Sequence, residues 1–183
     1  KFGQYQNAWK SLDQELSSIY YLAKTSYLDD IGSWGKNFSC VAVQETDKNR
    51  EDKTVKSRFH YKNEASGDKI MEVTETVQAV KTFEYQNSEN AIKYLVTGEK
   101  PLVDTFAFSD ENCDLLYVPY ANGDQGGFEL WVRDSHIDEV PSYCNFLFSY
   151  FVSKENTRTE YLKYDKNMCK DVVQKIAGLQ GRN

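Results

Sequence analysis

The sequence is poor in the residues that build most catalytic and metal sites. It has only two histidines, His60 and His136, and its four cysteines form no Cys-x-x-Cys pair. A zinc site is therefore not expected, and neither is a Ser/His or Cys/His catalytic device. A glycine-rich phosphate loop and a Gly-x-Ser-x-Gly motif are also lacking, so nothing predicts a cofactor. We expect a binding protein and not an enzyme.

Long apolar runs and an excess of basic charge are lacking as well. No apolar stretch approaches the ~20 residues of a membrane helix, and Lys1 is not followed by a signal-like segment. We therefore expect a soluble protein with no membrane partner and, if it is secreted, a sequence in its mature form. The net charge of −6 argues against a nucleic-acid partner, which requires a basic groove.

Aromatic residues, by contrast, are abundant. They make up 14% of the chain and include 13 tyrosines. Tyrosine combines an apolar ring with a hydroxyl group, so this content fits a lined cavity or a binding surface. A tyrosine-rich core is an equal alternative on composition alone.

The four cysteines are scattered along the chain, at Cys40, Cys113, Cys144 and Cys169. An even number of scattered cysteines predicts two disulfides and an oxidising compartment. Free thiols buried in a cytosolic protein are the alternative. The spacing leaves all three pairings open.

The order of the predicted elements indicates a mainly β protein. The length fits one domain over residues 1–183, with a short arm at 1–6 and a polar tail at 170–183. A helix capped by Asn7 is predicted over 8–17, and a final helix runs from Pro141 to Phe151. Extended runs are predicted at 19–27, 38–46, 55–61, 69–80, 91–96, 102–109, 113–120 and 128–133. Eight such runs indicate an up-and-down antiparallel barrel or a sandwich.

The segment 127–132 carries the most informative pattern. Because side chains alternate along a strand, Glu129 and Trp131 would point to the same face. A carboxylate beside an indole suits a pocket for a cationic aromatic ligand, in which the acid pairs with the charge and the ring stacks. The alternative is a solvent-facing Glu129, with Trp131 covered by another element.

Further acids share a strand face with apolar or aromatic residues. They are Glu75, Asp104 and Asp114. Asp104, for example, alternates with Phe106 and Phe108. Burying unpaired carboxylates is costly, so these groups would stay protonated or await a cation, which a ligand ammonium or imidazolium would supply. Ion pairs with basic residues such as Lys93 and Arg133 are the structural alternative.

Short motifs between about residue 7 and Cys169 form one ordered set that covers most of the chain. They are Ala8-Trp9-Lys10-Ser11-Leu12, Tyr20-Tyr21, Tyr27, Trp34-Gly35, Phe38-Ser39-Cys40, Asn90-Ala91, Tyr94, Ser109-Asp110-Glu111-Asn112-Cys113-Asp114, Tyr117-Val118-Pro119 and Glu129-Leu130-Trp131. Together they resemble the tick salivary histamine-binding proteins, which are secreted lipocalins.

The resemblance implies an eight-stranded antiparallel lipocalin barrel with an N-terminal and a C-terminal helix. It also implies the disulfides Cys40–Cys169 and Cys113–Cys144. The function it implies is that of a secreted scavenger, which sequesters histamine, and here serotonin as well, and suppresses host inflammatory responses. We expect a monomer, because every cysteine would be paired within the chain.

The family is known for two internal amine sites, and their residues are carried over position by position. The first set comprises Tyr27, Asp30, Glu75, Ile92, Tyr94, Leu102, Glu129 and Trp131. The second set comprises Ser11, Glu15, Trp34, Asp104, Phe108 and Asp114. The resemblance implies that Asp30 and Glu129 hold the ligand cations in the first set. In the second set Trp34 would stack on the ligand ring.

Three positions depart from the family pattern. Relatives often carry phenylalanine at the positions of Ile92 and Leu102, and aspartate at that of Glu15. Aliphatic side chains in place of two rings would enlarge the first site and remove stacking partners there. We therefore expect serotonin in the first site and histamine in the second.

Two other functions remain open. A lipocalin of the same fold can bind a lipid mediator such as a fatty acid or a leukotriene, which needs a basic residue in the cavity. A protein-binding immune modulator would instead use the outer surface of the barrel. The sequence also contains one N-glycosylation acceptor, Asn37-Phe38-Ser39.

Overall fold

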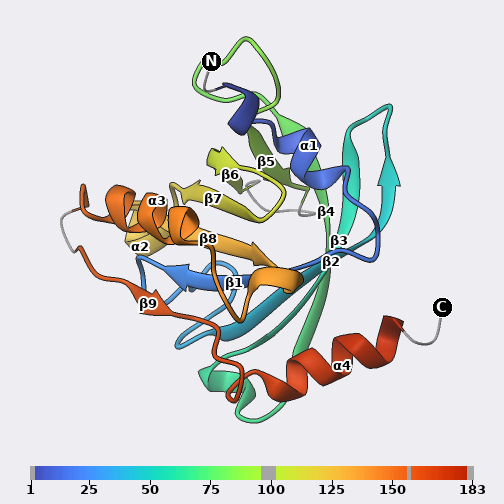
Figure 1. Cartoon of the computed structure of the whole chain (residues 1–183), viewed down its shortest axis with the longest axis vertical. Coiled ribbons are helices and arrows are strands. Elements are labelled where there is room, and N and C mark those ends of the chain that lie inside the picture. Colours follow the sequence, from blue (N-terminus) through green and yellow to red (C-terminus); the bar gives the residue numbers. More distant parts are fainter. Residues whose placement is uncertain (1–2, 96–101, 156–157, 181–183) are drawn as a thin grey trace.

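The strands of the chain form an antiparallel β-barrel (Figure 1). The computed structural model describes residues 3–95, 102–155 and 158–180. The strands are β1 (Ile19–Thr25), β2 (Ser39–Asn49), β3 (Thr54–Lys62), β4 (Met71–Val80), β5 (Ala91–Tyr94), β6 (Val103–Ser109), β7 (Cys113–Val118), β8 (Gly127–Arg133) and β9 (Tyr161–Leu162). Neighbouring strands follow the order β2-β3-β4-β5-β6-β7-β8-β1-β9, and pairing of β1 with β2 closes the barrel. The expected eight-stranded barrel is thus confirmed, with the two-residue β9 added at the end of β1.

Short helical elements flank these strands. They are η1 (Gly3–Tyr5), α1 (Ala8–Leu12), η2 (Glu64–Ser66), α2 (Ala121–Asp124), η3 (Asp134–His136), α3 (Ser142–Val152) and α4 (Lys170–Gln180). The predicted final helix corresponds to α3, although Pro141 lies at its N-cap and not in its first turn. None of the helices in the described ranges is long and apolar enough to cross a membrane.

The strand bounds differ from the predicted runs by a few residues. Strand β2 continues to Asn49, three residues beyond the predicted end, because it pairs with β3 as far as Thr54. Strand β7 ends at Val118, and the chain turns at Tyr120. The run expected at 91–96 forms β5 as far as Tyr94, and its last residue, 96, lies outside the described residues.

Alternating side chains of the strands divide the apolar residues into two groups. The inner core fills the barrel and includes Leu22, Val41, Phe59, Val77, Phe106 and Leu116. The outer core lies between the barrel wall and helices α3 and α4, and includes Tyr21, Leu115, Leu130, Phe148, Val172 and Ile176. In β8, Leu130 belongs to the outer core and Trp131 to the inner core, so this strand is covered on both faces.

The first helix is shorter than the sequence predicts. Asn7 caps α1 as expected, since its side chain accepts a hydrogen bond from the backbone N–H of Lys10. The helix ends at Leu12, however, and Asp13 is its C-cap residue. The expected extension to residue 17 is wrong. Leu16 has the spacing of a buried helical residue, but its side chain is exposed, so no packing contact of Leu16 holds a longer helix in place.

Both disulfides implied by the resemblance are present. Cys40–Cys169 joins the start of β2 to the residue that precedes α4. Cys113–Cys144 joins β7 to α3. The first closes a loop with a sequence separation of 129 residues. In the chain-entropy model such a closure stabilises the fold by about 5 kcal/mol, through the unfolded state.

The segment expected as a polar tail contains a packed helix. Residues 170–180 form α4, which lies at the end of the molecule opposite α1 (Figure 1). Val172 and Ile176 are buried in the outer core. The expected polar tail thus includes a helix over these residues, and two buried side chains one turn apart hold it to the barrel.

Candidate ligand-binding site

Two cavities occupy the barrel interior, one toward each end. The α1-end cavity has a volume of about 70 Å³ and is lined by Ser11, Leu12, Gln14, Ser18, Tyr20, Val43, Glu45, Ser57, Phe59, Val77, Ile92, Tyr94, Phe106, Asp114, Leu116 and Trp131. The loop-end cavity has a volume of about 190 Å³ and is lined by Gly32, Ser33, Trp34, Tyr61, Val73, Glu75, Tyr94, Leu102, Asp104, Tyr120 and Glu129.

Aromatic rings lie between the two cavities. The ring centre of Phe59 is 6.4 Å from that of Tyr94 and 6.4 Å from that of Trp131. Tyr94 lines both cavities, while Phe59 and Trp131 line the α1-end cavity. On the loop-end side, the Trp34 ring packs 5.1 Å from Phe59. The barrel interior is thus divided by an aromatic layer with carboxylates on both sides of it.

Glu129 is the most fully bonded acid of the loop-end cavity. One of its carboxylate oxygens accepts a hydrogen bond from the Tyr27 hydroxyl, and the other accepts one from the Trp131 indole N–H at 2.7 Å. The Glu129 side chain is buried, on the same face of β8 as Trp131. Burial raises the pKa of Glu129 to about 7, although both hydrogen bonds oppose the shift.

Asp104 is the second buried acid in this cavity. Burial raises its pKa well above the usual range, and the negative charge of Glu129 raises it further. Hydrogen bonds from Tyr120 and Tyr94 act in the opposite direction. Oδ1 of Asp104 nevertheless has no hydrogen-bond partner within the described part of the chain. A buried carboxylate oxygen without a partner is a strong acceptor for a ligand N–H group.

Two further residues place charge close to these acids. Asp30 is buried beside the cavity, where its carboxylate accepts a hydrogen bond from the Ser33 backbone N–H at 3.1 Å. Burial raises the pKa of Asp30. Lys163 is buried as well, and its ammonium donates to the carbonyl oxygens of Leu28 at 2.7 Å and Phe38 at 3.2 Å. Burial lowers the pKa of Lys163 to about 8, and the negative charges of Asp29, Glu129 and Asp30 act in the opposite direction.

Glu75 and Leu102 complete the loop-end cavity. Both side chains are partly exposed, which places them toward its mouth. Burial raises the pKa of the Glu75 carboxyl. Together with Glu129 and Asp104, it gives this cavity three acids. An ammonium group that entered would therefore meet negative charge from the mouth inward.

The α1-end cavity contains a buried acid of its own. One oxygen of Asp114 accepts a hydrogen bond from the Ser11 hydroxyl at 2.6 Å. The other oxygen, Oδ1, and the hydroxyl of Tyr20 have no partners among residues 3–95, 102–155 and 158–180. Burial raises the pKa of Asp114 to about 6. This cavity therefore also presents a carboxylate to a ligand.

Ion pairing with neighbouring strands does not explain the inward acids. In the described ranges, no ion pair includes any of the acids predicted from strand alternation, Glu75, Asp104, Asp114 and Glu129. Arg133, one of the bases considered as a partner, instead donates a hydrogen bond to the Ser18 hydroxyl at 2.9 Å. The interior acids are thus held by hydroxyl, indole and backbone donors.

The structure distributes the two predicted residue sets differently from the sequence interpretation. Four members of the first set line the loop-end cavity, namely Glu75, Tyr94, Leu102 and Glu129. Tyr27 and Trp131 contact Glu129, and Asp30 lies buried nearby. Ile92 lines the α1-end cavity instead, with Ser11 and Asp114 of the second set. Trp34 and Asp104, also of the second set, line the loop-end cavity.

Two residues of the second set do not line either cavity. Phe108 lies outside the barrel, where its ring stacks on Tyr5 at 5.3 Å. A register shift between Phe106 and Phe108 breaks the alternation of β6 and turns Phe108 outward. Glu15 is exposed. Residues four apart lie on the same face of a helix, but α1 ends at Leu12, so Glu15 does not share a helix face with Ser11.

Some lining residues were not identified from the sequence. Glu45 on β2 lines the α1-end cavity, and Tyr120 lines the loop-end cavity. The signal for Glu45 was its alternation with Val41 and Val43, which contact the inner core. Tyr120 follows β7 in a turn, and Lys163 lies in an irregular segment after β9, so strand alternation could not have identified either residue.

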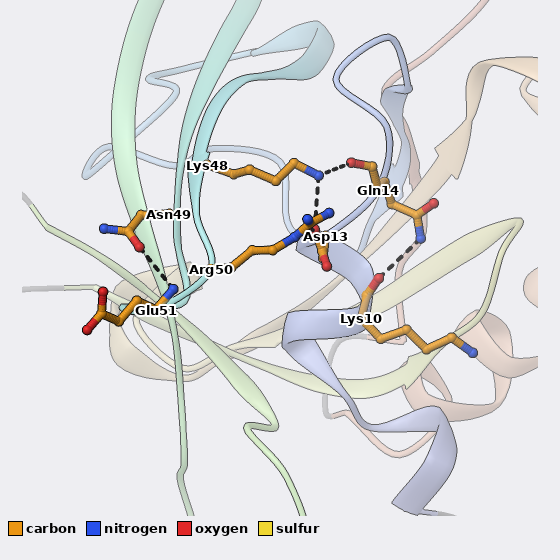
Figure 2. Close-up of polar contacts among 7 residues, drawn as sticks. All are labelled: Lys10, Asp13, Gln14, Lys48, Asn49, Arg50 and Glu51. Carbon is orange, nitrogen blue, oxygen red and sulfur yellow. Dashed lines mark hydrogen bonds and ion pairs between the residues drawn. The ribbon is translucent and has the colours of Figure 1, made fainter.

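A group of polar contacts fastens the segment after α1 to the β2–β3 hairpin (Figure 2). The carboxylate of Asp13 lies 3.0 Å from the Lys48 ammonium and 3.1 Å from the Arg50 guanidinium. Lys48 also donates to the backbone carbonyl of Gln14, whose side-chain amide donates to the carbonyl of Lys10 at 3.2 Å. Because Gln14 lines the α1-end cavity, these contacts fix one wall of that cavity.

A closed antiparallel barrel with a lined interior and flanking helices defines a lipocalin, a class of binding proteins. Comparison with known proteins gives the family. The family model described as "Tick histamine binding protein" matches residues 1–171, and the chain belongs to this family of non-enzymatic binding proteins.

Individual relatives agree with this assignment, and a solved structure shares the fold. A male-specific histamine-binding salivary protein of Rhipicephalus appendiculatus is 38% identical over 174 residues, which cover 93% of this chain and 84% of the relative. Female-specific histamine-binding protein 1 of the same tick is 34% identical over 160 residues, with 87% and 81% covered. The structure of lobster apocrustacyanin A1 shares the fold, with a TM-score of 0.53, 11% identity, and 86% and 84% covered.

Proposed function

We propose that the protein is a secreted scavenger that sequesters histamine and serotonin in the two cavities. The observation that carries this proposal is the set of buried carboxylates that form no ion pair within the described ranges, foremost Glu129 and Asp104. Such groups are costly in a low-dielectric interior unless a cation neutralises them. The relatives, both named as histamine-binding proteins, support a biogenic amine as that cation.

The sizes of the cavities support a division of ligands. The loop-end cavity is the larger, at about 190 Å³ against about 70 Å³. Leu102 lines it, and a phenylalanine at this position would occupy more of the cavity. Serotonin, with its bulkier indole, would bind there, with its ammonium toward Glu129 and Asp104. Histamine would bind in the α1-end cavity and pair with Asp114. Trp34 offers an aromatic face to the serotonin ring.

Secretion fits both the chemistry and the relatives. The two disulfides are typical of an oxidising compartment, and one relative is named a salivary protein. A scavenger released at a feeding site would bind amines before host receptors do, which would suppress inflammatory responses. Such a function needs binding without turnover, and it needs no cofactor.

A lipid ligand is the weaker alternative. A fatty acid would bring its own carboxylate into a cavity that already contains Glu75, Asp104 and Glu129. Lys163, whose positive charge acts on Glu129, donates to two backbone carbonyls and is not among the lining residues. Like-charge repulsion in a buried site would therefore oppose lipid binding.

Sequential calorimetric titration tests the proposed function. The protein is titrated first with serotonin to saturation, and the loaded protein is then titrated with histamine. We expect two binding events with a total of two ligands per chain. Mutual exclusion of the two amines at one ligand per chain would contradict the division between cavities. No heat from either amine would overturn amine binding and favour the lipid alternative.

A further inference from the structure

Glu45 is an acid of the barrel interior that strand alternation places on the cavity side of β2. Val43 and Val41, two and four residues earlier, contact the inner core. Glu45 continues this face and lines the α1-end cavity. It pairs in register with Ser57 on β3, which is buried and lines the same cavity.

The contacts of Glu45 hold its carboxylate in place without neutralising it. The Ser57 hydroxyl lies 2.8 Å from one carboxylate oxygen and 3.1 Å from the other, so it donates to this group. Lys48, three residues along the chain, has its ammonium bound to Asp13 and to the Gln14 carbonyl. Of the ion pairs within the described ranges, none includes Glu45.

Unpartnered polar atoms lie on another wall of the same cavity. Oδ1 of Asp114 on β7 and the hydroxyl of Tyr20 on β1 are buried and have no hydrogen-bond partner in the part of the chain described. In the closed sheet, β8 and β1 separate β7 from β2. The cavity therefore presents one carboxylate on each of two separated strands, and the residues between them are largely apolar.

We propose that Glu45 is a ligand-binding carboxylate of the α1-end cavity, and that with Asp114 it binds a compact molecule with a cationic or N–H-donating nitrogen at each end. This inference rests on the proposed function and names the second acid of its histamine site. A small diamine or an amino-imidazole has this chemistry, and a cavity of about 70 Å³ favours such a molecule over an indole amine.

Glu45 takes the place that the family resemblance assigned to Glu15. The carboxylate of Glu15 is exposed, because α1 ends at Leu12 and the following turn carries this residue away from the cavity. Both residues are glutamates, yet only Glu45 lines the cavity. Burial also raises the pKa of Glu45 to about 7, as expected for an acid that a ligand cation would restore to its charged form.

The test compares Glu45→Gln with Glu15→Gln, two substitutions of identical chemistry. Serotonin is first added to saturation, and histamine is then titrated into wild type and each variant by calorimetry. Loss of a charge-assisted hydrogen bond predicts histamine binding weakened about 10- to 100-fold in Glu45→Gln. Glu15→Gln should match wild type, and serotonin affinity should be the same in all three proteins.

A third variant, Ser57→Ala, separates ligand binding from packing. It keeps the carboxylate of Glu45 and removes its hydrogen-bond donor, so it should retain most of the histamine affinity. Equal losses in Ser57→Ala and Glu45→Gln would overturn the inference, because they would indicate a wall-packing role. Wild-type affinity in Glu45→Gln would also overturn it while leaving the proposed function intact. Wild type that binds neither amine would overturn both.

Discussion

At the scale of single residues, the apolar barrel interior contains carboxylates that accept hydrogen bonds but form no ion pair within the described ranges. Glu129 receives hydrogen bonds from Tyr27 and Trp131, whereas Asp104 keeps one oxygen without a partner in the described ranges. Burial raises the pKa of Asp104, and the negative charge of Glu129 raises it further. Such an arrangement is unfavourable for the free protein and becomes favourable when a cation binds.

Replacing Asp104 by asparagine should therefore stabilise the free protein. Asp104→Asn removes a charge buried beside Glu129 and keeps the size of the side chain. We expect the free energy of unfolding at pH 8 to rise by about 1–3 kcal/mol. Urea denaturation of the unliganded protein measures this change. Asp68→Asn, which removes the same charge from an exposed position, is the control and should change stability little. A less stable Asp104→Asn protein would contradict this view of the site.

Strand alternation predicted individual site residues where the strands are regular. Glu129 and Trp131 share a face of β8, and Asp104 and Asp114 point inward as expected. Phe108 was assigned wrongly because the bulge in β6 reverses its face, and a bulge leaves no mark in the alternation of apolar residues.

At the scale of elements, the sequence identified the eight barrel strands and α3 but not the ends of the chain. Helix α1 stops early, and its following segment is held by Asp13 through Lys48 and Arg50, contacts between residues far apart in sequence. Helix α4 was missed because its mean composition is polar. Only two of its residues, Val172 and Ile176, are buried. Tertiary contacts determine both the length of α1 and the presence of α4, and the local sequence does not encode such contacts.

Helix α4 should contribute measurably to stability. Ile176 is 1% exposed in the outer core, so Ile176→Ala should lower the free energy of unfolding by about 2–4 kcal/mol. Chemical denaturation monitored by circular dichroism provides the measurement. Gln174→Ala, at an exposed position of the same helix, should differ from wild type by less than about 0.5 kcal/mol. Equal stability of the two variants would mean that α4 does not pack as described.

At the scale of the whole molecule, the closed barrel and its two disulfides keep several acids buried. Burial disfavours the ionised form of each carboxyl group. Glu129 and Asp114 have pKa values raised to about 7 and about 6 by burial, from 4.5 and 3.8. The folded state therefore binds more protons than the unfolded state between those values. Stability contributed by these groups is complete below pH 4 and is lost as the pH rises through 6 and 7.

This linkage predicts an unusual pH dependence for the free protein. Its free energy of unfolding should be higher at pH 5 than at pH 8, by roughly 2–4 kcal/mol, because each unit of pKa shift corresponds to 1.36 kcal/mol. Urea denaturation at the two pH values, with and without saturating serotonin, measures it. The amine should reduce the difference, since its charge favours the ionised acids. A free protein that is more stable at pH 8 would show that the buried acids are neutralised from within.

The central claim is that buried carboxylates bind the cation of an amine, and calorimetric titration of serotonin into wild type and Glu129→Gln tests it most directly. Loss of this charge should weaken serotonin binding about 10- to 100-fold. The fold should stay intact, because the glutamine side chain has nearly the same size. Glu139→Gln, an exposed control, should bind as wild type does. Equal affinity of Glu129→Gln and wild type would contradict the account.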